Sequence, residues 1–162
     1  FAIIDMVVDL PNVQSISNSQ DVMPIDSNNT GKVIALRRKG NILVVDDEEF
    51  IREVITDCLS STGHNVVQAS DGEEALGLIK SNHFDIIFLD LSLPKKDGTE
   101  LLPEIEKIDP NSTVVIVSAR PESQLPDNIT RMGAYHLIKK PFSVNQIQNT
   151  VARVLGAEAL SR

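Results

Sequence analysis

Short apolar runs alternate with amphipathic segments along the chain from residue 41 onward. Residues 42–45 and 86–89 are apolar at every position, which predicts strands buried on both faces of a sheet. Between such runs, apolar residues recur every three or four positions, which predicts helices. The expected strands are 41–45, 65–69, 84–89, 113–117 and 135–138, and the expected helices are 48–62, 71–81, 98–108 and 143–155. Five strands alternating with helices predict an α/β fold with a parallel sheet covered on both faces.

Polar residues at the helix ends support these boundaries. Ser70 with Glu73, and Ser143 with Gln146, have the spacing of a capping box, in which each residue of the pair accepts a backbone N–H bond. Gly63 follows the first helix and is expected to end it.

The segment 121–133 is less regular. Pro126 lies where a helix interior is expected, and proline is tolerated only in a first turn. We therefore expect a short helix that begins late, near Pro126 or Asp127. Gly133 is expected as the C-cap of that helix.

Composition divides the chain near Gly40. Residues 11–32 are rich in Asn, Ser, Asp, Pro and Gly, which is typical of a linker. We interpret residues 1–40 as an N-terminal extension or linker, which could be the end of an upstream module, and residues 41–158 as the folded domain. The triplet Arg37-Arg38-Lys39 is interpreted as the solvated end of that linker.

The charge distribution excludes some functions. Residues 1–40 carry four acidic and four basic residues, so the net charge of −8 lies in the remainder of the chain. An acidic domain is not expected to bind nucleic acid directly, because that requires a basic face. No apolar run reaches the roughly 18–20 residues of a membrane span. The single cysteine, Cys58, is expected as a buried helix residue in a reducing compartment.

Three aspartates come directly after predicted strands. Asp46 and Asp47 follow the first strand, and Asp90 follows the third. Parallel strands end on the same edge of a sheet, so these carboxylates should converge there. Two like charges at ~4 Å repel by roughly 4 kcal/mol at an effective dielectric of ~20. Such a cluster needs a cation, a nearby lysine or raised pKa values, and indicates a divalent metal site beside a carboxylate that could be phosphorylated.

Residues 42–155 resemble a two-component response-regulator receiver domain. The resemblance rests on four segments in order, Ile42-Leu43-Val44-Val45-Asp46-Asp47-Glu48, Phe88-Leu89-Asp90-Leu91-Ser92-Leu93-Pro94-Lys95-Lys96-Asp97-Gly98, Val117-Ser118-Ala119 and Lys139-Lys140-Pro141-Phe142. It implies a flavodoxin-like fold with strand order 2-1-3-4-5. It also implies that Asp90 accepts phosphate, and that Asp46, Asp47, Asp90 and the backbone carbonyl of Ser92 bind Mg²⁺.

Two further residues suit phosphoryl transfer, in which negative charge lies on the equatorial oxygens. Lys140 follows the fifth strand and can neutralise phosphoryl oxygens as a point charge. Ser118, at the end of the fourth strand, can donate a hydroxyl hydrogen bond. The resemblance favours a cis Lys140–Pro141 bond that aims Lys140 into the cluster.

The resemblance implies a function in signalling rather than enzyme catalysis, apart from self-phosphotransfer and autodephosphorylation. Expected partners are a histidine kinase or histidine phosphotransfer protein and a downstream effector protein, in the cytoplasm. The family usually has an aromatic residue three positions before its active-site lysine. Here that residue is Leu137, which places aromatic switching in doubt.

Three alternatives differ in the residues they need. A phosphohydrolase that forms an aspartyl phosphate needs a second acid two positions after Asp90, where this chain has Ser92. A flavodoxin needs a phosphate loop after the first strand, where Asp46 and Asp47 would repel phosphate. A degenerate receiver that acts only as an interaction module would lack acceptor or metal residues.

The chain begins with Phe1 rather than Met, and its first ten residues are largely apolar. We expect a receiver from a larger response regulator or hybrid kinase, with a self-contained regulator as the alternative. The apolar residues 1–10 could pack on the receiver or pair two chains as a homodimer, because exposed apolar segments usually mark interfaces.

Overall fold

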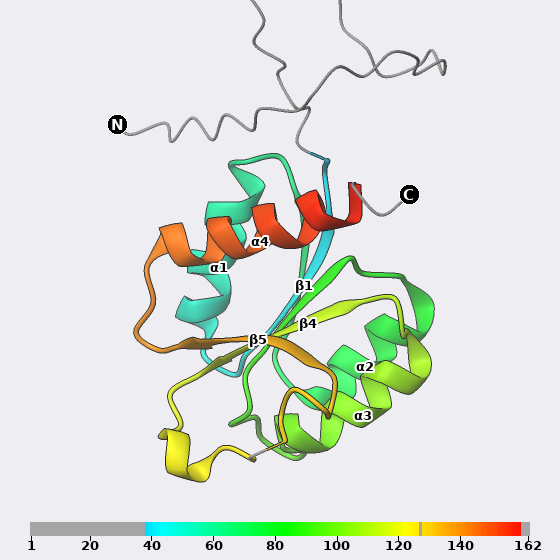
Figure 1. Cartoon of the computed structure of the whole chain (residues 1–162), viewed down its shortest axis with the longest axis vertical. Helices are drawn as coiled ribbons and strands as arrows, with labels where there is room; N and C mark the ends of the chain where they lie inside the picture. Colours follow the sequence, from blue (N-terminus) through cyan, green and yellow to red (C-terminus); the bar gives the residue numbers. More distant parts are fainter. Residues whose placement is uncertain (1–37, 127, 160–162) are drawn as a thin grey trace, which may run out of the picture. The chain divides into compact units, whose positions relative to one another are not determined.

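The computed structural model describes residues 38–126 and 128–159. Strands and helices alternate through this part of the chain (Figure 1). In chain order the elements are β1 (Asn41–Val45), α1 (Glu49–Ser60), β2 (Asn65–Ala69), α2 (Gly72–Ser81), β3 (Ile86–Leu89), α3 (Gly98–Ile108), β4 (Thr113–Ser118), a 3₁₀ turn (Glu122–Gln124), β5 (Ala134–Lys139) and α4 (Val144–Ala159). The predicted α/β alternation is confirmed except between β4 and β5, and several element boundaries differ from the predicted ones by a few residues.

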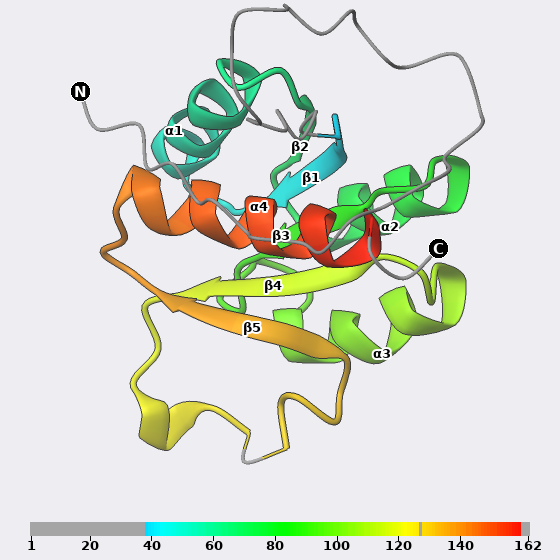
Figure 2. The ribbon, with the colours of Figure 1, turned by 45° about the horizontal axis from the view of Figure 1, so that its top comes forward.

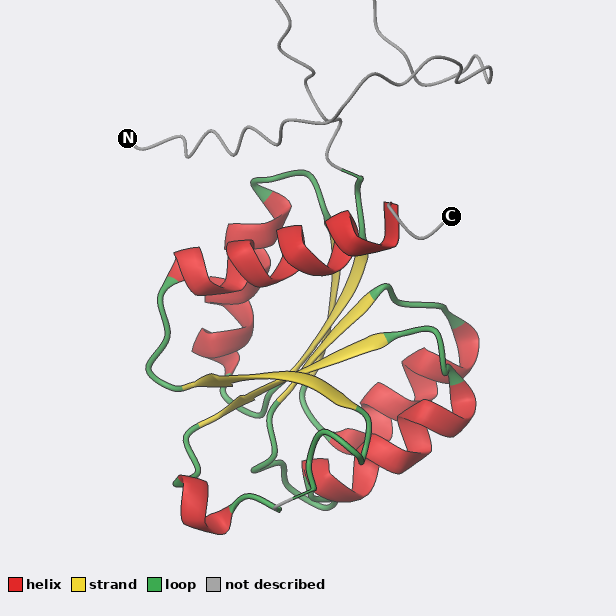
Figure 3. Ribbon diagram, in the orientation of Figure 1, coloured by secondary structure: helices red, strands yellow, loops and turns green. Residues whose placement is uncertain are grey.

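The five strands form one parallel sheet in the order β2-β1-β3-β4-β5, which confirms the order that the family resemblance implied. Helices α1 and α4 cover one face and α2 and α3 the other (Figures 2 and 3). Alternate residues of each strand point to opposite faces. In β1, Ile42 and Val44 pack in the layer beneath α1 and α4, whereas Leu43 and Val45 pack in the opposite layer. Burial on both faces is the reason that residues 42–45 of β1 and 86–89 of β3 are apolar at every position, whereas the edge strands β2 and β5 carry exposed polar residues.

The N-terminus of α2 is capped by Asp71, so the predicted cap at Ser70 is wrong. The Asp71 side chain accepts hydrogen bonds from the N–H groups of Glu73 and Glu74. The reciprocal bond runs from the Ser70 N–H to the Glu74 carboxylate at 2.8 Å. The carboxylate that bonds back is therefore Glu74, one position beyond the predicted Glu73.

The capping box predicted for the last helix is confirmed. The Ser143 N–H donates to Oε1 of Gln146 at 2.8 Å, and the Gln146 N–H donates to Oγ of Ser143 at 3.3 Å. Cys58 is buried in α1, as expected, and burial raises the pKa of its thiol.

The α-helix expected to begin near Pro126 or Asp127 is wrong for the described residues, because 128–133 form hydrogen-bonded turns and the segment before them holds only the 3₁₀ turn Glu122–Gln124. Gln124 bonds the carbonyl of Pro121, and Gly133 bonds that of Thr130, both with the three-residue spacing of a tight turn. Gly133 has φ +106°, and its N–H bonds the Thr130 carbonyl while the Ala134 N–H bonds the Ile129 carbonyl. These two bonds are those of a Schellman motif, so Gly133 has the predicted capping geometry at the end of the single turn that precedes it. Pro126 lacks an N–H donor, which removes one bond from any helix continuing through it. Asp127 lies outside the described residues.

The first described residues bind the base of the sheet. The Arg38 guanidinium donates to Oδ1 of the buried Asp85 at 2.7 Å, and the Asn41 N–H donates to Oδ2 at 2.7 Å. The Gly40 N–H donates to Nδ1 of His64 at 3.1 Å. The expectations for the remaining extension, residues 1–37, lie outside the described part of the chain.

Gly98, the first residue of α3, provides a test of the packing around the third strand end. A Cβ there would lie against the Asp90 carbonyl oxygen and 2.7 Å from Cα of Leu91, both backbone atoms. Gly98→Ala should lower the free energy of unfolding by about 1–3 kcal/mol, measured by urea denaturation, because the backbone must move. Gly77→Ala in α2 is the matched control, since no atom lies within 4 Å of its Cβ. A helix-interior alanine should stabilise there by up to about 1 kcal/mol. Equal effects of the two substitutions would contradict the packing described.

Candidate phosphoacceptor site

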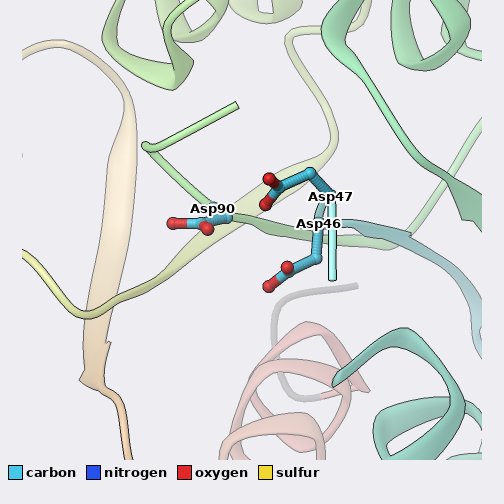
Figure 4. Close-up of side chains that lie close together, drawn as sticks. All are labelled: Asp46, Asp47 and Asp90. Atoms are coloured by element: carbon cyan, nitrogen blue, oxygen red, sulfur yellow. The ribbon is translucent and has the colours of Figure 1, made fainter. Parts of the chain in front are cut away.

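Three carboxylates meet at the carboxyl edge of the sheet. Asp46 and Asp47 directly follow β1, Asp90 directly follows β3, and these strands are neighbours. Asp46 and Asp90 are 2% and 4% exposed, whereas Asp47 is exposed. One oxygen from each of the three lies within 4.8 Å of the others (Figure 4). The structure thus brings together the three aspartates that the sequence analysis singled out.

Lys140 supplies the positive charge in this cluster. Its Nζ lies 2.7 Å from Oδ2 of Asp46, 3.2 Å from Oδ2 of Asp90 and 3.1 Å from Oε1 of Glu48. The lysine follows β5, and the Lys140–Pro141 bond is cis, as expected. Its side chain is only 9% exposed. The Lys140 ammonium group therefore bridges carboxylates from two strand ends and the start of α1.

The electrostatics of the cluster favour a charged lysine. Burial raises the pKa of Asp46, and this effect outweighs the hydrogen bonds from Lys140 and the Glu48 N–H. Burial alone would lower the pKa of Lys140, but the hydrogen bond to Asp46 and the charge of Asp90 raise it well above the usual range. Lys140 therefore carries a full charge at neutral pH and partly neutralises the buried carboxylates.

Glu48 is a member of the cluster that the sequence analysis missed. It occupies the N-cap position of α1 but makes no side-chain capping bond. Its carboxylate instead bonds Lys140, and its N–H donates to Oδ1 of Asp46 at 2.9 Å. Its place directly after two aspartates at a strand end was a signal for this role.

Two serines border the site. Ser118, the last residue of β4, is 1% exposed, and its Oγ accepts the Arg120 N–H at 3.2 Å. A hydroxyl that accepts one bond still has a proton to donate. The Ser92 N–H donates to Oδ1 of Asp90 at 3.1 Å, which engages the second oxygen of that carboxylate. Metal ligation by the Ser92 carbonyl remains a prediction.

The donor set fits a magnesium ion. Mg²⁺ takes octahedral oxygen ligands at about 2.1 Å, which places ligand oxygens about 3–4 Å apart. Carboxylate oxygens that already lie within 4.8 Å of one another need only small shifts to reach that spacing. Mg²⁺ also retains several of its water ligands. The exposure of Asp47 to solvent leaves room for such waters on that side of the cluster.

Comparisons with known proteins agree with this geometry. The sequence model of the response regulator receiver domain matches residues 42–152. The chain belongs to the response regulator receiver domain family. It is therefore a phosphoacceptor domain of two-component signalling.

Relatives of this receiver differ in length. The sporulation initiation phosphotransferase F of Bacillus subtilis is 32% identical over 114 residues, covering 70% of this chain and 92% of the relative. The probable transcriptional regulator ycf27 of Porphyridium aerugineum is 39% identical over 120 residues, covering 73% of this chain. The receiver spans about half of ycf27, at 49%.

Solved structures share the fold of this receiver. NtrX from Brucella abortus superposes with a TM-score of 0.71 at 35% identity, covering 77% of this chain and 28% of NtrX.

None of the helices described for the receiver is long and apolar enough to cross a membrane.

At the expected aromatic position, the receiver has Leu137, which is partly buried against the core in β5. Tyr135, two residues earlier in the same strand, is exposed. The position at which the family usually has an aromatic residue is therefore occupied by a partly buried leucine.

Removal of the central cation tests the electrostatic balance of the receiver. Lys140→Met should lower the free energy of unfolding by about 3 kcal/mol at pH 7, because it leaves buried carboxylates without their counter-charge. The loss should shrink toward pH 4, since the pKa of Asp46 is already raised by burial and a protonated carboxyl needs no cation. Urea denaturation at both pH values measures this.

The control is Lys107→Met, which removes the same charge from an exposed position in α3. Its effect should stay within about 0.5 kcal/mol at both pH values. If Lys140→Met lowered the free energy of unfolding as little as Lys107→Met does, Lys140 would not be the counter-charge of the buried carboxylates.

Proposed function

We propose that Asp90 accepts a phosphoryl group from a phosphohistidine, with Mg²⁺ held by Asp46, Asp47, Asp90 and the Ser92 carbonyl. The observation that carries the proposal is the convergence of three aspartates and Lys140 at one sheet edge. A bound Mg²⁺ would neutralise charge on the phosphoryl oxygens during transfer.

The residues of the receiver supply position and charge. An Asp90 oxygen forms the new bond to phosphorus, while the phosphorus–nitrogen bond breaks and its electron pair returns to the imidazole. The Lys140 ammonium group donates a hydrogen bond to Oδ2 of Asp90, and in this position it can bind a phosphoryl oxygen as a point charge. The Ser118 hydroxyl donates to another oxygen. The Ser92 N–H holds the acceptor carboxylate in place.

We further propose that the donor is a histidine kinase or a histidine phosphotransfer protein, and that the phosphorylated receiver acts on an effector protein in the cytoplasm. Chemistry at the receiver itself is limited to self-phosphotransfer and autodephosphorylation. Because the matched region is about half of ycf27 and 28% of NtrX, we propose that the receiver belongs to a larger signalling protein.

Substitution of the acceptor tests the proposal. With acetyl phosphate and Mg²⁺, the wild-type chain should gain the mass of one phosphoryl group, and Asp90→Asn should gain none, because an amide oxygen is a poor nucleophile. Intact-mass spectrometry measures both. Asp57→Asn, at an exposed aspartate of α1, should behave as wild type. Unchanged phosphorylation of Asp90→Asn would refute the assignment.

The metal assignment has a separate test. Asp47→Ala should weaken Mg²⁺ binding by more than about tenfold, because loss of a charged ligand should exceed the effect of losing an outer partner. Calorimetric titration with MgCl₂ measures the affinity, and Asp57→Ala is the control. Equal affinities for the two variants would exclude Asp47 as a ligand.

A further inference from the structure

Arg120, two residues after β4, binds the loop that follows the phosphoacceptor. Its Nε donates to Oγ of Ser92 at 3.1 Å, and its Nη2 donates to the Leu91 carbonyl at 2.8 Å. The guanidinium group also forms a two-point ion pair with the Asp97 carboxylate. One side chain that follows β4 thus contacts the β3–α3 loop both near its start, at Leu91 and Ser92, and at its end, at Asp97.

The central contact is with the peptide bond between Leu91 and Ser92. The carbonyl of this peptide accepts from Arg120 at 2.8 Å and from the Gly98 N–H at 2.9 Å. Its N–H donates to Oδ1 of Asp90 at 3.1 Å. Because a peptide unit is planar and rigid, the donors on its carbonyl also orient its N–H. Arg120 therefore reaches Asp90 through a single rigid group.

The other end of the contact is anchored on α3. Asp97 is the N-cap residue of that helix, and its Oδ1 accepts from the Thr99 N–H at 2.9 Å and the Thr99 hydroxyl at 2.7 Å. The Arg120 and Asp97 side chains are 22% and 34% exposed, so the pair is largely shielded from water. Arginine suits this place because its planar fork can bind a carboxylate and a carbonyl together, which a lysine ammonium cannot reproduce.

We propose that Arg120 is a positioning residue of the phosphoacceptor site. It orients the Leu91–Ser92 peptide, and thereby the Asp90 carboxylate and the Ser92 residue whose carbonyl is the proposed metal ligand. The hydrogen bonds described for Arg120 run to Leu91, Ser92, Asp97 and Ser118 and not to Asp90 itself. The expected effect of Arg120 on Mg²⁺ binding rests on the proposed function. The expected effect of Arg120 on the orientation of the Ser92 N–H does not.

Two readouts separate these parts. The first is hydrogen exchange of the Ser92 N–H, measured by NMR without metal. The second is Mg²⁺ affinity, measured by calorimetry. Arg120→Ala and Arg120→Lys should each raise the exchange rate at Ser92 by roughly tenfold and weaken Mg²⁺ binding by about the same factor, as expected for a partner behind a ligand. The exchange rates of the β1 and β3 amides should not change.

Arg120→Lys keeps the charge and decides the question if Arg120→Ala does not fold. Arg153→Ala, at an exposed position of α4, is the control for loss of one positive charge and should leave both readouts unchanged. Asp97→Asn added to Arg120→Ala should produce little further change, because the two residues act through one contact.

Wild-type exchange at Ser92 and wild-type Mg²⁺ affinity in Arg120→Lys would overturn the inference. Faster exchange at every amide would also overturn it, since that indicates general destabilisation. If the wild-type chain binds no Mg²⁺ but Ser92 exchange still responds to Arg120, then the metal part of the proposed function fails while the positioning contact stands.

Discussion

Two carboxylates buried at the edge of a parallel sheet require a cation beside them, and the site depends on how that requirement is met. Asp46 and Asp90 end adjacent strands, so the topology itself forces them together. At an effective dielectric of ~20, charges ~4 Å apart repel by roughly 4 kcal/mol. Lys140 offsets this repulsion because β5 ends at the same edge, and the bonds to the two aspartates keep the lysine charged. Lys140 and the carboxylates therefore balance each other's charge, and the same groups are the ones that the proposed metal and phosphoryl group would contact.

Around this cluster, the backbone after β3 makes closer contacts than the backbone after β4. Gly98 lies so close to the Asp90 carbonyl that it leaves no room for a side chain, and Arg120 holds the loop between them. By contrast, turns rather than an α-helix follow Arg120 through the described residues before β5. The loop after Asp90, the proposed phosphoacceptor, is thus held by Gly98 and Arg120, and Arg120 also lies at the start of the irregular segment.

The parts of the structure predictable from sequence are those decided by local pattern. Strands β1 and β2 and helix α3 have the predicted boundaries, because apolar runs of β1 and β2 and the helical spacing of apolar residues in α3 are local patterns. The cap of α2 was misplaced by one residue, since Ser70 and Asp71 each have a glutamate three residues later. The expected helix near Pro126 was wrong because periodicity does not show how a proline-interrupted segment satisfies its backbone.

Some residues of the candidate site were likewise predictable from the sequence and others were not. Asp46, Asp47, Asp90, Ser118 and Lys140 could be named from the sequence, because the ends of parallel strands converge at one edge. Arg120 could not, because its contacts depend on the direction of its side chain across the fold, whereas Glu48 was missed although its place after Asp46 and Asp47 was a signal for its role. Glu48 lies 92 positions from Lys140 in the chain, and Arg120 lies 29 from Leu91. Distance in sequence does not decide which residues are predictable, since Lys140 lies 50 positions from Asp90 and could be named from its place after a strand.

The most direct test of the electrostatic account is the effect of Mg²⁺ on the melting temperature of wild type and Lys140→Met. A ligand that binds only the folded state stabilises it according to its concentration and affinity. Mg²⁺ should raise the melting temperature of both proteins, and more in Lys140→Met, where the carboxylates lack their resident cation. An equal shift in the two proteins, or none in either, would contradict the claim that these carboxylates share one charge balance with the metal.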